Sequence, residues 1–325
     1  MSLPDSYRAV VLPAFNADLV IEERAMPAPM GPDPQTLKVV AAGVCHSDVH
    51  VAEGRWPKLP TPLVMGHEVV VETGDGNCVV YAPWGCGDCR YCDATEEQLC
   101  DSVKEAGLVH DGGYAEYMQV PHPKYLFPIG DLDPAFAATF GCSSLTPYRC
   151  TRKALDWLPK GATCVLIGAG GLGQFGIQYL RAMCDATIIV ADTSPSKRAR
   201  ALELGAHEVC DTAELEGPVD CVFDYVGANE TLRVCNSIIR RGGLVVNVGA
   251  YGGHIPFGFS LVPHETWWTQ SMWGSRDDIA AVVKLAQRGD LQYRVERLPL
   301  DAAADAHRRI KAGDVDGRLV LIPSM

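Results

Sequence analysis

The chain has 325 residues, of which 47% are hydrophobic, and its formal net charge is −12. This length allows two domains, each with its own core, and the negative charge disfavours nucleic acid as a partner because it repels a phosphate backbone. Because the chain has neither a run of 18 apolar residues nor the basic segment and apolar core of a secretory signal, we expect a cytoplasmic protein without a membrane partner.

The N-terminal part of the chain, to about residue 140, is rich in proline, glycine and short β-type runs such as 37–44 and 78–84. This pattern predicts a mainly-β domain of short strands and long functional loops.

From residue 163 the pattern changes to strands that alternate with helices. We expect strands over 163–170, 187–192, 207–211, 220–227 and 243–250, and helices over 171–184, 194–206 and 229–243. Such alternation implies parallel strands joined by right-handed crossovers, and therefore a doubly wound α/β sheet. A last helix, over 276–290, precedes a short tail that ends in GRLVLIP, 317–323.

A glycine-rich turn, Gly168-Ala169-Gly170-Gly171-Leu172-Gly173, joins the first of these strands to its helix. The glycines let the backbone approach a pyrophosphate at the positive end of the helix. Asp192 ends the next strand, where a carboxylate can accept hydrogen bonds from a ribose diol. Its charge would repel a 2′-phosphate, so we expect NAD rather than NADP, although the nearby Lys197 and Arg198 could weaken that repulsion.

Thirteen cysteines, an odd number, fit a cytosolic protein that uses some of them as metal ligands better than a secreted disulfide framework. Four of them, Cys86, Cys89, Cys92 and Cys100, follow the spacing C-x2-C-x2-C-x7-C. Four thiolates at that density suit a closed tetrahedral zinc site, with an iron–sulfur cluster as the main alternative. The acidic residues around them argue against a zinc ribbon that binds nucleic acid.

A second group of metal-seeking residues is dispersed along the chain. The stretch GVCHSDVH, 43–50, holds a cysteine, two histidines, a serine and an aspartate, while Gly66-His67-Glu68 and Cys142 lie further on. Two cysteines and a histidine from separate segments can form a zinc site with an open fourth position for water or substrate. Spacing alone leaves such a site and a set of unrelated side chains equally plausible.

Several motifs together resemble the zinc-dependent, medium-chain alcohol dehydrogenases. They are GVCHSD, GHE, the four-cysteine lobe, DGGYAEY (111–117), the glycine turn and GR near the end, and they extend over nearly the whole chain. The resemblance implies a GroES-like, mainly-β catalytic domain over 1–144 with a structural-zinc lobe at about 84–101. It also implies a Rossmann domain over 145–274, and a C-terminal segment, 275–325, that returns to the catalytic domain.

The resemblance also implies roles for individual residues. Cys45, His67 and Cys142 resemble the ligands of a catalytic zinc ion, and the four-cysteine lobe resembles a structural zinc site. Asp48 resembles the carboxylate that orients the ligand histidine, Glu68 the acidic residue behind the metal, and Ser47 with His50 a proton relay. The residues that resemble cofactor contacts are His46, Thr146, Gly168, Gly170, Gly171, Leu172, Gly173, Asp192, Lys197, Val226, Val248 and Arg318.

The substrate pocket is the part of the site that the motifs define least. Trp56, Trp84, His110 and Phe140 are the candidate wall residues, and the two tryptophans resemble pocket residues of microbial members of the family. The alternative is that both tryptophans only anchor loops.

The function implied is the reversible transfer of a hydride between a primary or secondary alcohol and NAD, with two zinc ions per subunit of a homodimer or homotetramer. The small-molecule partner is then an alcohol, aldehyde or ketone. A polyol or sugar dehydrogenase of the same superfamily is the near alternative. A zinc- and nucleotide-binding homologue without catalysis is the alternative from another class.

Two segments are shorter than the family pattern, namely 69–83, where relatives usually carry an additional hairpin, and 212–219. A parallel crossover generally needs a dozen or more residues, including a helix. Because 212–219 can form a loop but not a packed helix, we expect one layer over the sheet to be missing there.

Overall fold

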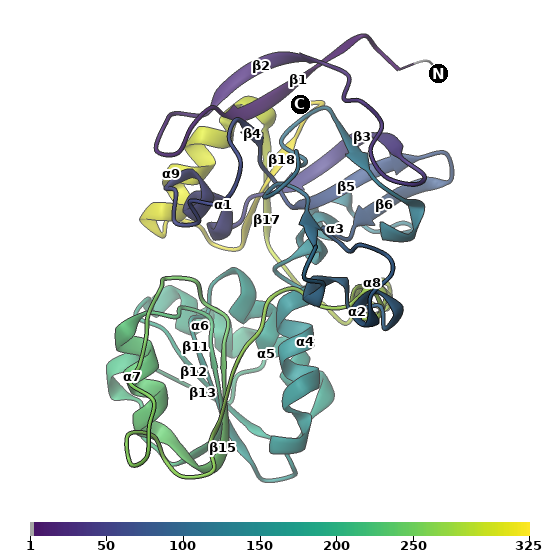
Figure 1. Cartoon of the computed structure of the whole chain (residues 1–325). Helices are drawn as coiled ribbons and strands as arrows, with labels where there is room; N and C mark the ends of the chain where they lie inside the picture. Colours follow the sequence, from purple (N-terminus) through teal and green to yellow (C-terminus); the bar gives the residue numbers. More distant parts are fainter. Residues whose placement is uncertain (1–2) are drawn as a thin grey trace. The chain divides into compact units, whose positions relative to one another are not determined.

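The computed structural model describes residues 3–325 and separates into two compact units (Figure 1). The first, here called the β unit, comprises the chain up to Leu145 together with Trp273–Met325, and the second, the α/β unit, comprises Thr146–Met272. None of the helices in residues 3–325 is long and apolar enough to cross a lipid bilayer.

The β unit is built on a seven-stranded sheet in the order β10-β6-β5-β3-β18-β17, with β9 paired to β3. All of its strand pairs are antiparallel except β17 with β18. The strands are β3 (Gln35–Gly43), β5 (Glu68–Thr73), β6 (Gly76–Val80), β9 (Tyr117–Val120), β10 (Leu126–Pro128), β17 (Val295–Pro299) and β18 (Arg318–Ile322). Valines of β5 and β6 are fully buried, so this sheet carries the core of the unit.

Smaller elements complete the β unit. A three-stranded sheet has the order β2-β1-β4, and a two-stranded ribbon pairs β7 with β8. Their bounds are β1 (Ser6–Leu12), β2 (Val20–Ala25), β4 (Leu63–Val64), β7 (Pro83–Trp84) and β8 (Lys104–Glu105). The helices are α1 (His46–Ala52), α2 (Arg90–Asp93), α3 (Pro134–Ala138), α8 (Arg276–Gln287) and α9 (Ala303–Ala312), with short 3-10 turns η1 (Glu97–Leu99), η2 (Pro123–Tyr125), η3 (Thr139–Gly141) and η6 (Leu300–Ala302).

The C-terminal segment returns to the N-terminal part of the chain. Figure 1 shows the yellow strand β18 in the same unit as the purple β3, and the two strands pair through Val320 with Gly43 and Leu321 with Ala42. The N–H of Val44 also donates to the Leu319 carbonyl at 2.9 Å. The tail therefore stabilises the backbone immediately before Cys45.

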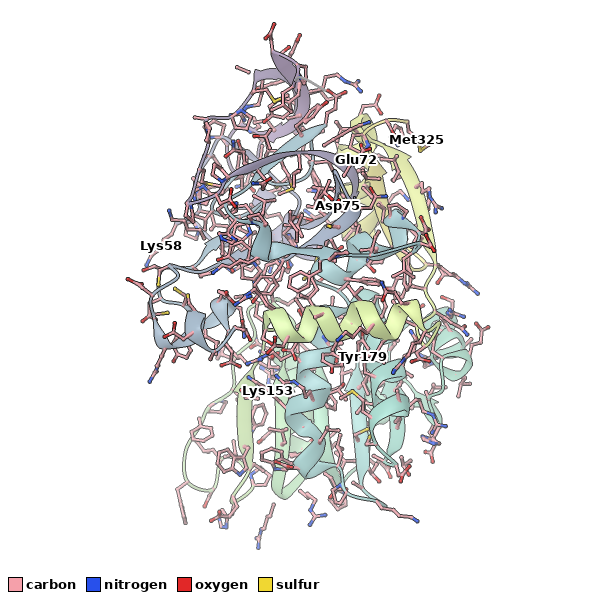
Figure 2. The ribbon with its side chains drawn as sticks, turned by 90° about the vertical axis from the view of Figure 1, so that its right-hand side faces the viewer. Lys58, Glu72, Asp75, Lys153, Tyr179 and Met325 are labelled. Carbon is pink, nitrogen blue, oxygen red and sulfur yellow. The ribbon has the colours of Figure 1, made fainter. Side chains whose placement is uncertain are left out.

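The short segment after Glu68 forms one tight hairpin. β5 and β6 pair as far as Thr73 with Gly76, so only Gly74 and Asp75 form the turn. Glu72 and Asp75, labelled in Figure 2, are exposed at this end of the hairpin.

The α/β unit has a six-stranded, fully parallel sheet in the order β13-β12-β11-β14-β15-β16, so the predicted doubly wound sheet is confirmed. The strands are β11 (Thr163–Ile167), β12 (Thr187–Ala191), β13 (Glu208–Cys210), β14 (Val219–Asp224), β15 (Ile239–Asn247) and β16 (Trp267–Gln270). The helices are α4 (Leu145–Ala154), α5 (Gly171–Met183), α6 (Pro195–Glu203) and α7 (Asn229–Ile238), with the 3-10 turns η4 (Leu155–Trp157) and η5 (Thr212–Glu214).

Side chains of this sheet alternate between two apolar cores because successive residues of a strand point to opposite faces. Leu166 of β11 packs with residues of α4, α5 and α6, whereas Val165 and Ile167 pack with residues of α7. On the first face, Tyr179 of α5 (Figure 2) meets the ring of Tyr148 edge-on, with centroids 5.2 Å apart.

Two elements differ from the sequence-based expectation. The helix expected over 229–243 ends at Ile238, because Ile239 is already extended and pairs with Val219 of β14. Strand β16, which follows a long irregular segment, was not predicted. Between β13 and β14 lies only the turn η5, so the expected loss of a helix from this crossover is confirmed.

Candidate functional site

The four cysteines of the lobe converge on one point. The Sγ atoms of Cys86, Cys89, Cys92 and Cys100 all lie within 4.8 Å of one another, with 3.9 Å from Cys86 to Cys92 and 3.6 Å from Cys89 to Cys92. Four sulfurs at the usual zinc–sulfur distance in a tetrahedron are about 3.8 Å apart. An iron–sulfur cluster would place several atoms between its thiolates, so these separations fit a single tetrahedral ion.

Backbone N–H groups support the same cluster. The N–H of Gly87 points at Cys92 Sγ (3.3 Å) and that of Cys86 at Cys100 Sγ (3.4 Å), contacts that favour thiolate ligands. The lobe is anchored by Glu97, which is fully buried and pairs with Arg276 at 2.6 Å and Lys124 at 3.6 Å. The lobe is therefore tied to the first residue of α8.

A second set of donors lies elsewhere in the β unit. Ligand atoms of Cys45, His67, Glu68 and Cys142 lie within 4.8 Å of one another. Cys45 is the N-cap of α1, His67 and Glu68 lie at the start of β5, and Cys142 follows η3. The fold thus brings together the three dispersed residues that resemble catalytic zinc ligands.

Asp48 determines the orientation of His67. Its Oδ1 lies 3.0 Å from Nδ1 of His67, and its Oδ2 accepts the N–H of Cys45 at 2.8 Å, closing a capping box on α1. Nδ1–H therefore donates to the carboxylate, which leaves Nε2 as the nitrogen available to a metal ion. Among residues 3–325, buried Nε2 has no hydrogen-bond partner, as expected for a metal ligand.

The hydroxyl of Tyr114 donates to Oδ2 of Asp48 at 2.9 Å, the oxygen that also accepts the Cys45 N–H. Tyr114 approaches because Gly66 lies opposite it; a Cβ at Gly66 would come within 2.3 Å of the Tyr114 ring, and its φ of +94° also favours glycine. Tyr114 lies in DGGYAEY, but the sequence motif did not indicate this hydrogen bond.

The two cysteine thiols of this set interact directly. A hydrogen bond from Cys142 lowers the pKa of Cys45 well below its ordinary value, with further help from His67 and Arg318 against the effect of burial. The same bond and burial raise the pKa of Cys142. A divalent cation would stabilise both thiolates, so the donor set fits a zinc ion with two sulfur ligands and one nitrogen ligand.

Glu68 lies beside this donor set and is held by its own partners. Its Oε1 accepts the N–H and hydroxyl of Ser143, both at 2.9 Å, and its Oε2 pairs with Arg318. Burial raises the pKa of the carboxyl, and Arg318 opposes the rise. Arg318 is itself buried in the β unit, and its guanidinium forms an ion pair with Glu68.

The relay candidates share helix α1. The rings of His46 and His50, one turn apart, have centroids 4.8 Å apart, and Trp56 lies 6.0 Å from His50. Burial, with help from His46, lowers the pKa of His50 to about 4. His50 is therefore neutral at pH 7 and a weaker base than an ordinary histidine. Ser47 is half-buried in the first turn of the same helix.

The glycine turn has the geometry that a nucleotide-binding loop needs. A Cβ at Gly173 would lie 2.0 Å from the Gly168 carbonyl oxygen, and one at Gly168 would lie 2.9 Å from Val226. By contrast, a Cβ at Gly170 would meet no atom within 4 Å. Asp192 accepts the N–H groups of Ala169 and Ser194 at 2.9 and 2.8 Å, which places its carboxylate at the turn.

The other expected cofactor contacts belong to the α/β unit, apart from His46, the first residue of α1, and Arg318, the first residue of β18, which belong to the β unit. Gly171 and Leu172 open α5, Val248 packs beside the core, and Thr146 is buried in α4. Arg198 rather than Lys197 donates to the backbone carbonyl of Asp192, at 2.6 Å.

The candidate pocket residues have unequal exposure. Trp56 is 37% exposed, whereas Trp84 is buried and its indole N–H donates to the Tyr81 carbonyl at 2.9 Å. His110 stacks on Trp84, and Phe140 is fully buried against Phe136. A residue that the sequence did not indicate, Trp273, has its ring 5.2 Å from that of His67.

Comparison with known proteins finds similar families for both the β unit and the α/β unit. The family model "Alcohol dehydrogenase GroES-like domain" matches residues 31–131, and "Zinc-binding dehydrogenase" matches residues 171–288. An NAD-dependent alcohol dehydrogenase of Saccharolobus solfataricus is 34% identical over 97% of this chain and 100% of its own length. An alcohol dehydrogenase of Geobacillus stearothermophilus is 32% identical over 97% and 98%.

Solved structures give the same result. The alcohol dehydrogenase of Aeropyrum pernix is similar with a TM-score of 0.89 and 30% identity, covering 97% of this chain and 100% of its own. The acetophenone reductase of Geotrichum candidum, solved with NAD, has a TM-score of 0.90 and 26% identity, with 99% and 98% covered. The chain therefore belongs to the zinc-type, medium-chain alcohol dehydrogenase family, and its predicted GroES-like and Rossmann folds are confirmed.

Proposed function

We propose that this protein is a zinc-dependent alcohol dehydrogenase that transfers a hydride between an alcohol and NAD, giving an aldehyde or ketone reversibly. The observation that carries the proposal is the donor set of Cys45, His67 and Cys142, in which Nε2 of His67 is buried without a hydrogen-bond partner among residues 3–325. Relatives named NAD-dependent alcohol dehydrogenase, 34% identical over nearly the whole chain, support the same activity.

Two zinc ions per subunit complete the proposal. Cys45, His67 and Cys142 hold the catalytic ion, and Cys86, Cys89, Cys92 and Cys100 hold a structural ion. When bound, the catalytic zinc acts as a Lewis acid on the substrate oxygen, and the nicotinamide takes or gives the hydride.

The protein side chains bind, orient and carry protons. Asp48 keeps His67 in the tautomer that leaves Nε2 available to the metal ion. Glu68 lies beside the three ligand residues and supports them. Ser47 and His50 carry the alcohol proton towards solvent; because the pKa of His50 is low, its ring passes the proton on rather than holding it. His46 and Arg318 are proposed cofactor contacts from the β unit.

NAD is the proposed cofactor because Asp192 keeps a negative charge at the glycine turn. The turn residues, with Leu172, Thr146, Lys197, Val226 and Val248, are its proposed contacts in the α/β unit. A D-arabinose 1-dehydrogenase (NADP(+)) of Saccharolobus solfataricus is 31% identical over 97% of the chain. Sugar oxidation is therefore the second candidate function. For alcohol oxidation, the first candidate function, the proposed walls of the substrate pocket are Trp56, Trp84, His110 and Phe140.

We also propose a cytoplasmic homodimer or homotetramer that acts on a small molecule, without nucleic-acid or membrane partners. Self-association is supported by exposed apolar side chains on the α/β unit, namely Phe257 and Phe259, which precede edge strand β16 in the sequence, and Trp267 within that strand. Light scattering coupled to gel filtration measures the subunit number, and a strict monomer contradicts this part.

The experiment that tests the activity follows absorbance of the reduced nicotinamide while primary alcohols, secondary alcohols and aldoses are offered with NAD or NADP. Metal analysis of the same sample counts the zinc ions. Reduction of NAD by simple alcohols, lost on chelation and restored by zinc, is the expected result. Protein that holds two zinc ions but reduces neither cofactor would favour the non-catalytic alternative.

A further inference from the structure

Trp273 has a backbone conformation that a bulky residue rarely adopts. Its φ is +56°, in the left-handed region, although the residue is not glycine. Its side chain is only 2% exposed. A strained backbone of this kind persists where surrounding contacts determine it, and such residues concentrate at functional sites.

The ring of Trp273 lies against His67. The two ring centroids are 5.2 Å apart and the planes are nearly perpendicular, at 87°. The hydrogen bond from Nδ1 to Asp48 restrains one point of the imidazole but leaves the ring able to swing about that point. A large flat side chain beside it limits the swing, and so directs Nε2 towards Cys45 and Cys142.

Trp273 is in turn held by Glu105. The indole N–H donates to Glu105 Oε1 at 3.0 Å. Glu105 lies in strand β8, where it pairs with Pro83, and its backbone carbonyl accepts the N–H groups of Val109 and His110 at 2.9 and 3.1 Å. The carboxylate therefore projects from backbone that is restrained on both sides, and it can hold the indole in one orientation.

Resting on the proposed function, we infer that Trp273, held by Glu105, is a positioning residue for the metal ligand His67. Trp273 touches the ligand rather than the reacting atoms, and Glu105 acts through Trp273. The two residues therefore contribute to the affinity for the catalytic metal as well as to turnover. Loss of partners that orient a metal ligand typically weakens metal binding about 10- to 100-fold.

The test compares Trp273→Leu with Trp84→Leu in the full chain. Trp84 is the matched control because it is equally buried and also donates its indole N–H, but it stacks on His110 instead of His67. Zinc per chain is measured after equilibration with increasing EDTA, and the catalytic ion is identified by its loss from Cys142→Ser. Circular dichroism verifies folding.

We expect Trp273→Leu to lose the catalytic ion at an EDTA concentration at least about 10-fold below the one that the wild type needs. Trp84→Leu should retain the ion as the wild type does. Glu105→Leu should follow Trp273→Leu, whereas Glu105→Gln should retain most of the affinity because an amide oxygen still accepts the indole N–H. Trp273→Phe keeps a ring beside His67, so its metal affinity should fall between those of the wild type and Trp273→Leu. It replaces Trp273→Leu in the test if that variant does not fold. In cobalt-substituted protein, Trp273→Leu should also shift the visible absorption bands.

Wild-type retention of the catalytic ion in Trp273→Leu and Glu105→Leu overturns the inference, and so does an equal loss in Trp84→Leu. These results leave the proposed function intact if the wild type binds two ions and oxidises alcohols. A wild type that binds no ion at Cys45, His67 and Cys142 overturns both.

Discussion

Oδ1 of Asp48 lies 3.0 Å from Nδ1 of His67, and both side chains are completely buried. Asp48 also accepts the N–H of Cys45, so one carboxylate restrains two of the three candidate metal ligands. This shared carboxylate explains why a cysteine and an aspartate occur three residues apart at the start of α1: they are the N-cap and the N3 residue of its capping box.

Replacing the carboxylate tests this arrangement. Asp48→Asn keeps the shape but removes the charge that favours a proton on Nδ1 of His67, so we expect zinc affinity at this site to fall about 10- to 100-fold. Competition with a chromogenic chelator measures the affinity. The lobe of four cysteines is the internal control, because its ion should be retained; unchanged affinity at both sites contradicts the role of Asp48.

The hydroxyl of Ser47 is expected to matter for proton transfer and not for metal binding. Ser47→Ala should slow alcohol oxidation by about 100-fold, the lower end for lost general acid–base help, while both ions are retained. Ser47→Thr restores a hydroxyl and should recover part of the rate. Steady-state rates with metal analysis of each variant decide the matter, and an undiminished rate in Ser47→Ala removes this residue from the relay.

The low pKa of His50 makes stability depend on pH in a stated direction. Burial lowers that pKa from 6.5 to about 4, so between these values the unfolded chain binds more protons, and stability falls as the pH drops. In His50→Gln the loss of unfolding free energy between pH 7 and pH 4.5 should be smaller by about 1–2 kcal/mol. Urea unfolding at both pH values measures the loss, with a variant of an exposed histidine, His254→Gln, as the control. Equal losses in the wild type, His50→Gln and His254→Gln would contradict the role of His50.

The charge of Asp192 should control the choice of cofactor. Asp192→Asn keeps an oxygen for the N–H groups of the turn but removes the repulsion of a 2′-phosphate. We expect the ratio of kcat/KM for NAD over NADP to fall at least about 10-fold, which corresponds to about 1.4 kcal/mol. Asp192→Glu keeps the charge and is the control. A ratio that stays constant in Asp192→Asn would place the discrimination elsewhere.

The four-cysteine lobe is expected to stabilise the fold. Cys89→Ser should leave one zinc ion per chain and cost at least about 2 kcal/mol of unfolding free energy, because the lobe has little apolar core of its own. Cys184→Ser, a half-buried cysteine outside both donor sets, is the matched control. Calorimetry compares them, and equal melting temperatures argue against a folding role for the lobe.

The sequence by itself determined the features that depend on neighbouring residues. The spacing of Cys86, Cys89, Cys92 and Cys100 could be recognised as a metal site because all four lie within one short loop. The glycine turn and the strand–helix alternation were readable for the same reason, since local backbone geometry dictates both. The family resemblance then supplied roles for residues that spacing alone left open.

Tertiary structure alone decided which distant side chains meet. Cys45, His67 and Cys142 converge because β3, β5 and η3 pack in one unit, and local periodicity contains no information about that packing. The pairing of Arg318 with Glu68 depends on β18 joining β3, and the contact of Trp273 with His67 depends on the chain returning after Met272. Contacts between residues far apart in sequence are determined by the burial of the whole core, and so they appear only in the folded chain.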